Sequence, residues 1–141
     1  MSEFLREYAR RFAELDKDNL HLLGELYSED IAFADPLHEV HGLPDLRRYF
    51  TELYANVRDL TFEFHGFDDV SEGKGYLRWT MNYRHPRLNQ GHPIAVQGCS
   101  YLQWSDNKVF QHRDFFDAGA LLYEHLPVMG RMIGWLKRRL A

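Results

Sequence analysis

The sequence has one cysteine, Cys99, among its 141 residues. A single thiol excludes an intramolecular disulfide and is typical of proteins from a reducing compartment. An excess of positive charge is also lacking, because 17 Lys and Arg residues stand against 21 Asp and Glu residues, which gives a formal net charge of −4. This balance argues against a nucleic-acid partner, since such proteins carry a basic surface.

Long apolar runs are absent as well, and a membrane-spanning helix needs about 20 consecutive apolar residues. The first residues, MSEFLREYARR, are charged from the third position and lack the apolar core of a secretory signal. We therefore predict no membrane span and a cytoplasmic location. The length suits one domain over residues 1–141, and 45% hydrophobic residues suffice for a sizeable core.

Three segments of the first half show the apolar spacing of helices. The first is predicted to begin at Ser2, the second to run from Asp18 through Tyr27, and the third to start near Pro44. Alternating segments typical of strands cover residues 31–35, 59–67, 75–85, 93–104 and 108–117. Helices followed by hairpin-linked strands predict an α+β fold, with one curved, mostly antiparallel sheet wrapped around the N-terminal helices.

The C-terminal region is predicted to add a short helical piece at residues 119–125 and a last helix that ends near Leu140. Gly130 and Gly134 on this last helix would permit close helix packing. We interpret the helix as docked on the domain, and the alternatives are a lid over the pocket or a contact with a membrane surface.

The stretch Lys108–Asp117, KVFQHRDFFD, contains the most informative residue, Asp114. Its alternation places four side chains on one face: Phe110, His112, Asp114 and Phe116. A carboxylate in an apolar row costs several kcal/mol unless it has a partner, a proton or access to water. Asp114 is therefore either an acid/base group or a structural ion-pair partner. His112 either influences the proton of Asp114 or fills the pocket wall.

Asp35 is the second candidate acid/base residue. It precedes Pro36, so it could also be present only to form the turn. Asp35, His38 and His41 are metal-ligating residue types in one loop, but no tight metal site has this spacing on a loop. We predict neither a metal ion nor a cofactor.

Three segments in this order, LYSEDIAFADP, HGLPDLRRYF and QHRDFFD, resemble the nuclear-transport-factor-2-like superfamily over residues 2–117. Within it the sequence is most similar to SnoaL-like polyketide cyclases, ketosteroid isomerases and limonene-epoxide hydrolases. The resemblance implies one SnoaL-like domain with a cone-shaped sheet and a pocket. It does not specify the chemistry, because this superfamily includes both enzymes and non-enzymes.

Two of these families match only in part. In ketosteroid isomerases Asp35 would match the general base, but Phe12 and Ser100 stand where that family has oxyanion donors. Losing such donors costs several kcal/mol of transition-state stabilisation, which disfavours steroid isomerisation. In limonene-epoxide hydrolases an Asp–Arg–Asp set orients water, and Asp114 matches one of its aspartates. Trp79 and Met81 stand at the other two positions, so the water-orienting set is absent.

SnoaL-like cyclases use an acid/base aspartate on the last strand, and Asp114 matches it. The resemblance therefore implies a cyclase or isomerase that moves a proton next to a carbonyl group, with Asp114, Asp35 and His112 as candidate catalytic residues. The alternative is a non-catalytic carrier of an apolar small molecule. The predicted pocket wall is mostly aromatic, as suits an apolar ligand: Phe12, Phe33, Trp79, Met81, Tyr83, Ser100, Phe110 and Phe116.

The opposite face of the long strands mixes polar and aromatic residues: Tyr76, Arg78, Gln97, Tyr101, Gln111, Arg113 and Phe115. Members of the superfamily commonly dimerise through the sheet. The resemblance therefore implies a homodimer through this outer face. Cys99 is expected on or near the same face and to be structural rather than reactive.

Overall fold

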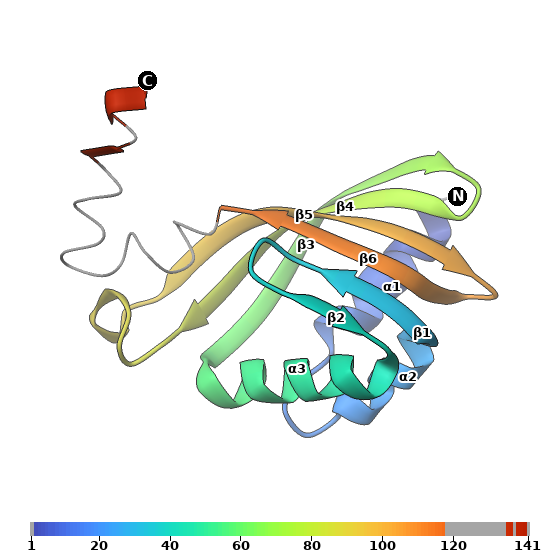
Figure 1. Cartoon of the computed structure of the whole chain (residues 1–141), viewed down its shortest axis with the longest axis horizontal. Helices are drawn as coiled ribbons and strands as arrows, with labels where there is room; N and C mark the ends of the chain where they lie inside the picture. Colours follow the sequence, from blue (N-terminus) through green and yellow to red (C-terminus); the bar gives the residue numbers. More distant parts are fainter. Residues whose placement is uncertain (1, 118–134, 137, 141) are drawn as a thin grey trace.

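The computed structural model describes residues 2–117, 135–136 and 138–140 (Figure 1). The helices are α1 (Ser2–Ala13), α2 (Leu23–Leu26) and α3 (Leu43–Asn56), with short 3₁₀ turns at Leu20–Leu22 and Asn89–Gly91. The strands are β1 (Tyr27–Ala34), β2 (Glu39–His41), β3 (Arg58–Ser71), β4 (Lys74–Arg84), β5 (Ile94–Ser105) and β6 (Lys108–Phe116). In the described part of the chain no helix is long and apolar enough to cross a lipid bilayer.

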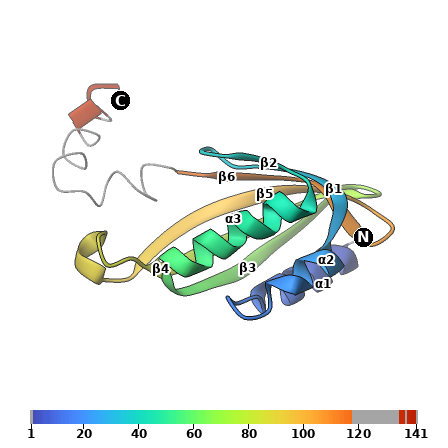
Figure 2. The same ribbon diagram turned by 60° about the horizontal axis from the view of Figure 1, so that its bottom comes forward.

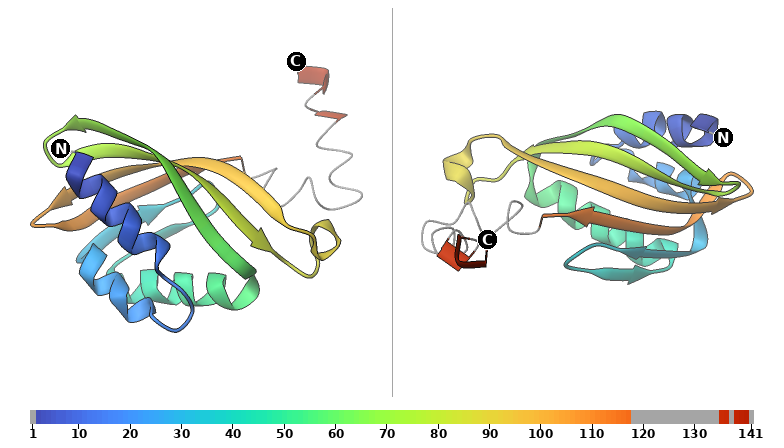
Figure 3. Two further views of the ribbon diagram at one scale, coloured as in Figure 1. Left: turned by 180° about the vertical axis from the view of Figure 1, so that it is seen from behind. Right: turned by 90° about the horizontal axis from the view of Figure 1, so that it is seen from above.

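The six strands form one curved, unclosed sheet in the order β2-β1-β6-β5-β4-β3. Every neighbouring pair is antiparallel except β1 and β6, which are parallel. Helices α1, α2 and α3 all lie on the concave side of this sheet, as Figure 2 and the left view of Figure 3 show. This arrangement confirms the predicted α+β class and the sheet wrapped around N-terminal helices.

The core fills the space between the helices and the concave face. On α1 the inward positions recur every three or four residues, and Leu5, Tyr8 and Phe12 are buried there. On α3, Pro44 stands in the first turn, where its missing N–H needs no partner. Leu46 and Phe50 then point into the core.

The C-terminal prediction is only partly covered by the described residues. Residues 135–136 and 138–140 are helical, in agreement with a helix near the C-terminus. The predicted piece at residues 119–125, Gly130 and Gly134 lie outside the described residues.

Two local predictions were wrong near the start of the sheet. Tyr27 does not end a helix; it begins β1 and pairs with Val109 of β6. The loop predicted after Pro36 contains a short strand, β2, which pairs antiparallel with β1. Tyr27 is fully buried, and its burial in the sheet overrides the weak local helix signal. Strand β2 is largely exposed and forms through its pairing with β1.

The predicted inward position of Phe110 was also wrong. Trp104 pairs with Val109 and Gln103 pairs with Gln111, so Phe110 is an extra residue in β6 without a partner opposite. Such a bulge shifts the alternation by one residue. Val109 is therefore fully buried, whereas Phe110 is 37% exposed.

The convex face carries the mixed polar and aromatic residues that the sequence placed there. The strand register puts Tyr76 beside Tyr101, Arg78 beside Cys99, and Cys99 beside Phe115. Cys99 is half-buried, and burial raises the pKa of its thiol, which disfavours the reactive thiolate.

Candidate functional site

A cavity of about 340 Å³ lies on the concave side, between the sheet, α1 and α3. Its wall includes every predicted substrate-binding residue except Phe110: Phe12, Phe33, Trp79, Met81, Tyr83, Ser100 and Phe116. The three candidate catalytic residues, Asp35, His112 and Asp114, line the same cavity. Most other lining side chains are aromatic or aliphatic, so the site suits an apolar small molecule.

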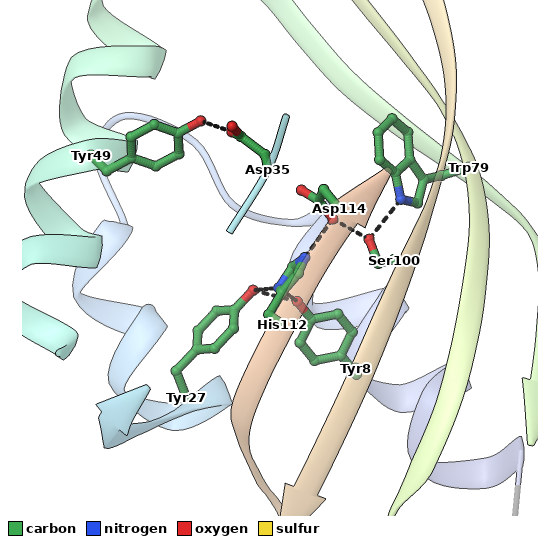
Figure 4. A network of polar contacts seen from close by, with 8 residues as sticks. All are labelled: Tyr8, Tyr27, Asp35, Tyr49, Trp79, Ser100, His112 and Asp114. Carbon is green, nitrogen blue, oxygen red and sulfur yellow. Dashed lines mark hydrogen bonds and ion pairs between the residues drawn. The ribbon is translucent and has the colours of Figure 1, made fainter. Parts of the chain in front are cut away.

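Asp114 lies in this cavity at the centre of a hydrogen-bonded group (Figure 4). Its Oδ1 is 2.6 Å from His112 Nε2 and accepts a hydrogen bond from Ser100 Oγ at 2.5 Å. Trp79 Nε1 in turn donates to Ser100 Oγ at 2.8 Å. No hydrogen bond from a described residue reaches Oδ2, which makes this oxygen the one open to a ligand. The Asp114 side chain is 18% exposed, against 4% for His112.

The register of the sheet explains this geometry. Ser100 of β5 stands directly opposite Asp114 of β6. His112 lies two residues before Asp114 in β6, so its side chain is on the same face of the sheet. Phe33 of β1 stands opposite His112 and packs edge-on against its ring, with centroids 4.7 Å apart. The carboxylate and imidazole are thus held by rigid strands rather than by loops.

Two tyrosines contact the other side of His112. The Tyr27 hydroxyl is 2.9 Å from Nδ1, the Tyr8 hydroxyl is 3.4 Å from the same atom, and the two hydroxyls contact each other. Burial is the main cause that raises the pKa of Tyr8 and of Tyr27 well above the ordinary value of 10.0. Both therefore remain neutral hydrogen-bonding groups over the physiological range.

Asp35 lies in the cavity wall but its oxygens are already occupied. Oδ1 accepts hydrogen bonds from the backbone N–H groups of Leu37 and His38, at 2.8 and 2.7 Å, and lies 3.2 Å from His38 Nδ1. Oδ2 accepts from the Tyr49 hydroxyl at 2.5 Å. This pattern is that of an aspartate that fixes the turn after it. It favours the turn-forming interpretation over a general-base role.

The charges around the cavity are unequal. Among the described lining residues there are three carboxylates, Asp35, Glu52 and Asp114, but no Lys or Arg. Among these described residues an anionic ligand would therefore find no permanent positive charge to pair with. No group of three or more His, Cys, Asp or Glu side chains converges as a metal site in the described residues.

Several functional candidates were missed from the sequence, chiefly Tyr8, Tyr27 and Tyr49. Each was interpreted only as part of an apolar helical stripe. The available signal was the hydroxyl itself, because a buried tyrosine usually needs a hydrogen-bond partner. The partner could not be identified, since His112 and Asp35 are far from these tyrosines in the sequence.

Gly98 permits the cavity wall to form, which gives a testable prediction. It stands opposite both Trp79 and Phe116, and a Cβ atom there would lie 2.3 Å from the Trp79 ring. Gly98→Ala should displace the indole, break its hydrogen bond to Ser100 and destabilise the protein by about 1–3 kcal/mol. Urea unfolding and the near-ultraviolet circular dichroism of tryptophan measure both effects.

Gly24→Ala is the matched control for the Gly98 prediction. A Cβ atom at Gly24 would have its nearest neighbour at 3.5 Å, an ordinary contact, and alanine is the better helix former. We expect this variant to be as stable as the wild type or slightly more so. Equal stability of the Gly98 variant would contradict the close packing of Trp79.

Taken together, the curved sheet, the helices on its concave side and the apolar cavity between them are the architecture of the nuclear-transport-factor-2-like fold. The model of the SnoaL-like domain family matches residues 6–112. The chain therefore belongs to the SnoaL-like domain family. Comparison with curated proteins gives no significant match.

Solved structures show the same fold. A Catenulispora acidiphila protein with a ketosteroid isomerase-like fold, in complex with trimethylamine, is 14% identical, covers 89% of this chain and 94% of its own, and has a TM-score of 0.74. TsrD from Streptomyces laurentii is 18% identical, with 89% and 96% covered and a TM-score of 0.73. A candidate SnoaL-like polyketide cyclase from Jannaschia is 12% identical, with 85% and 90% covered and a TM-score of 0.72. At these identities the similarity establishes the fold alone.

Proposed function

We propose that this protein is an enzyme of the cyclase or isomerase type that moves a proton at a carbon next to a carbonyl group, with Asp114 as the acid/base residue. The observation that carries the proposal is the Asp114 carboxylate in a largely apolar cavity, with Oδ1 hydrogen-bonded and Oδ2 open. The substrate C–H bond breaks, its proton goes to Oδ2, and the electron pair delocalises into the carbonyl as an enolate.

The substrate should stabilise its own negative charge. An enolate needs hydrogen-bond donors aimed at its oxygen. The donors near Asp114 are already committed, because Trp79 donates to Ser100 and Ser100 donates to Asp114. Tyr49 is likewise committed to Asp35. We therefore propose an activated substrate, such as a β-dicarbonyl or an aromatic polyketide, that carries no carboxylate.

The structural relatives support the reaction class by analogy only. The Jannaschia protein is described as a candidate polyketide cyclase, and a similar Bacillus subtilis protein, 16% identical with a TM-score of 0.66, as a candidate isomerase. An epoxide-hydrolase-like reaction is less well supported. Trp79 and Met81, which replace two members of the water-orienting set, line the cavity but have no acid or base group.

The test is hydrogen–deuterium exchange at the acidic carbon of two bicyclic ketones that differ by one activating acetyl group. We expect the protein to accelerate exchange of 2-acetyl-1-tetralone above the buffer rate and to leave 1-tetralone at that rate. Mass spectrometry in deuterated buffer at mildly acidic pH measures both, since the buffer reaction is slower there. Equal acceleration of both ketones would show an oxyanion site that this proposal lacks, and no acceleration of either would reject it.

The second candidate function is a non-catalytic carrier of an apolar small molecule. The observation that favours it is the hydrogen bonding of Asp114, because His112 and Ser100 would also satisfy a purely structural carboxylate. In that case ligand affinity, rather than turnover, is the property of the site. We retain the cytoplasm as the proposed location for either function, since the protein has one cysteine.

We also propose that two copies associate through the convex face. Phe115 is 47% exposed there, the Arg113 guanidinium lies 5.6 Å from its ring centre, and Tyr76 and Tyr101 pack 5.0 Å apart. Exposed aromatic and arginine side chains are the residues that interfaces favour. Sedimentation at micromolar concentration should show a dimer.

Phe115→Glu should shift the sedimenting species toward the monomer by placing charge in the contact. Arg48→Glu, an exposed position on α3 on the concave side of the sheet, is the control and should leave the dimer intact. A monomeric wild type at these concentrations would contradict the proposal.

A further inference from the structure

The two tyrosines behind His112 form a polar cluster that the proton transfer does not use directly. Tyr27 is fully buried and Tyr8 is 3% exposed, yet neither belongs to an ion pair among the described residues. Tyr8 comes from α1 and Tyr27 from the first residue of β1, and both hydroxyls converge on His112 Nδ1 (Figure 4). A buried hydroxyl in an apolar core is costly unless it is hydrogen-bonded, so the convergence needs a physical explanation.

The hydrogen-bond directions follow from the carboxylate. Asp114 Oδ1 is an acceptor, so His112 Nε2, at 2.6 Å, must carry a hydrogen. In a neutral imidazole Nδ1 is then the acceptor, and the Tyr27 hydroxyl at 2.9 Å donates to it. Tyr8 donates to the Tyr27 oxygen. Every hydroxyl proton in this direction has an acceptor.

The reversed direction is less favourable. If His112 were doubly protonated, Nδ1–H would donate to Tyr27 and Tyr27 would donate to Tyr8. The Tyr8 proton would then have no acceptor, because its hydroxyl contacts only Tyr27 and His112 among the described residues. Leaving a buried donor without an acceptor costs about 1–3 kcal/mol. The cluster therefore favours the neutral imidazole with its hydrogen on Nε2.

We propose that Tyr27, supported by Tyr8, is a positioning residue for the Asp114 acid/base group. It holds His112 as the neutral Nε2–H tautomer, which keeps one hydrogen bond directed at Oδ1. On the other side, Trp79 and Ser100 direct a second hydrogen bond at the same oxygen. Two chains of donors thus converge on Oδ1 and leave Oδ2 to exchange the proton. The catalytic part of this proposal rests on the function proposed above.

The first measurement is the tautomer of His112, read from the two ring-nitrogen resonances of ¹⁵N-labelled protein at neutral pH. We expect one protonated nitrogen, Nε2, and one unprotonated nitrogen, Nδ1. This spectrum needs no substrate, so it tests the positioning separately from the activity. A doubly protonated ring or an Nδ1–H tautomer in the wild type would overturn the proposal, whatever any variant shows.

The second measurement uses Tyr27→Phe, which removes the donor to Nδ1. We expect the ring-nitrogen resonances to change and exchange of 2-acetyl-1-tetralone to slow by about 10- to 100-fold, the range found for partners that orient metal-ligating histidines. Affinity for the ketone should change little. Tyr54→Phe is the control, because Tyr54 is partly buried on α3 but does not line the cavity.

The outcomes separate the two proposals. Unchanged resonances and unchanged exchange in Tyr27→Phe would overturn the positioning role. If the resonances change but the wild type exchanges no ketone, the positioning of His112 stands and the proposed catalytic function is rejected. An equal loss in Tyr54→Phe would show a general packing effect and would also overturn the role of Tyr27.

Discussion

Asp114→Asn is expected to lower the rate of ketone exchange by about 10²- to 10⁴-fold, the range attributed to a positioned acid/base residue. An amide has nearly the shape of a carboxylate but cannot accept the substrate proton. The amide oxygen can still accept the hydrogen bonds from His112 and Ser100, which in the wild type reach Oδ1 at 2.6 and 2.5 Å. Ligand affinity should therefore change little, so the loss should fall on turnover.

Asp68→Asn is the matched control for this substitution. Asp68 belongs to β3, pairs with Arg78 at 3.2 Å and is exposed, so the same chemical change occurs away from the cavity. We expect wild-type exchange from this variant. If Asp114→Asn kept full exchange, another group would have to be the base. If neither the wild type nor Asp114→Asn catalysed exchange but both bound the ketone with equal affinity, the carrier function would replace the enzyme.

The shared orientation of His112 and Asp114 was predictable because both residues lie on one strand, β6. Side chains two residues apart share a face, so His112 and Asp114 had to point the same way. Ser100 was less predictable, because the tight turn after Trp104 pairs Ser105 with Lys108 and would alone place Ser100 opposite Arg113. The bulge at Phe110 shifts the register by one residue and brings Ser100 opposite Asp114. The alternation could not reveal this bulge, because a bulge leaves no clear mark in a short apolar sequence.

The tyrosine cluster was not predictable for a different reason. Tyr8 and Tyr27 have the spacing of ordinary core residues, and their hydroxyls meet His112 only after α1 and β1 pack on the sheet. Contacts of this kind depend on tertiary packing, which local periodicity does not encode. Asp35 shows the opposite case, since its place before Pro36 already indicated a turn, and its hydrogen bonds agree with one.

The same cluster should make the fold sensitive to high pH. Burial is the main cause that raises the pKa of Tyr8 and of Tyr27 well above 10.0, so both stay neutral in the folded protein. In the unfolded chain they would ionise above pH of about 10. The unfolded state then binds fewer protons than the folded state, and stability falls as the pH rises. The contribution is fully present below pH 10 and is lost above it.

The expected loss is about 1.4 kcal/mol for each of these tyrosines per pH unit above 10, or about 3 kcal/mol by pH 11 for the pair. Burial also raises the pKa of Tyr49, Tyr54 and Tyr83, so the loss due to the pair is the difference between the wild type and the double variant Tyr8→Phe/Tyr27→Phe in urea unfolding between pH 8 and pH 11. The double variant should be less stable than the wild type at pH 8, because it lacks the hydroxyl contacts to His112. Its stability should, however, fall less steeply above pH 10. Equal slopes for the two proteins would mean that the hydroxyls ionise in the folded state, and so that the cluster is not closed to water.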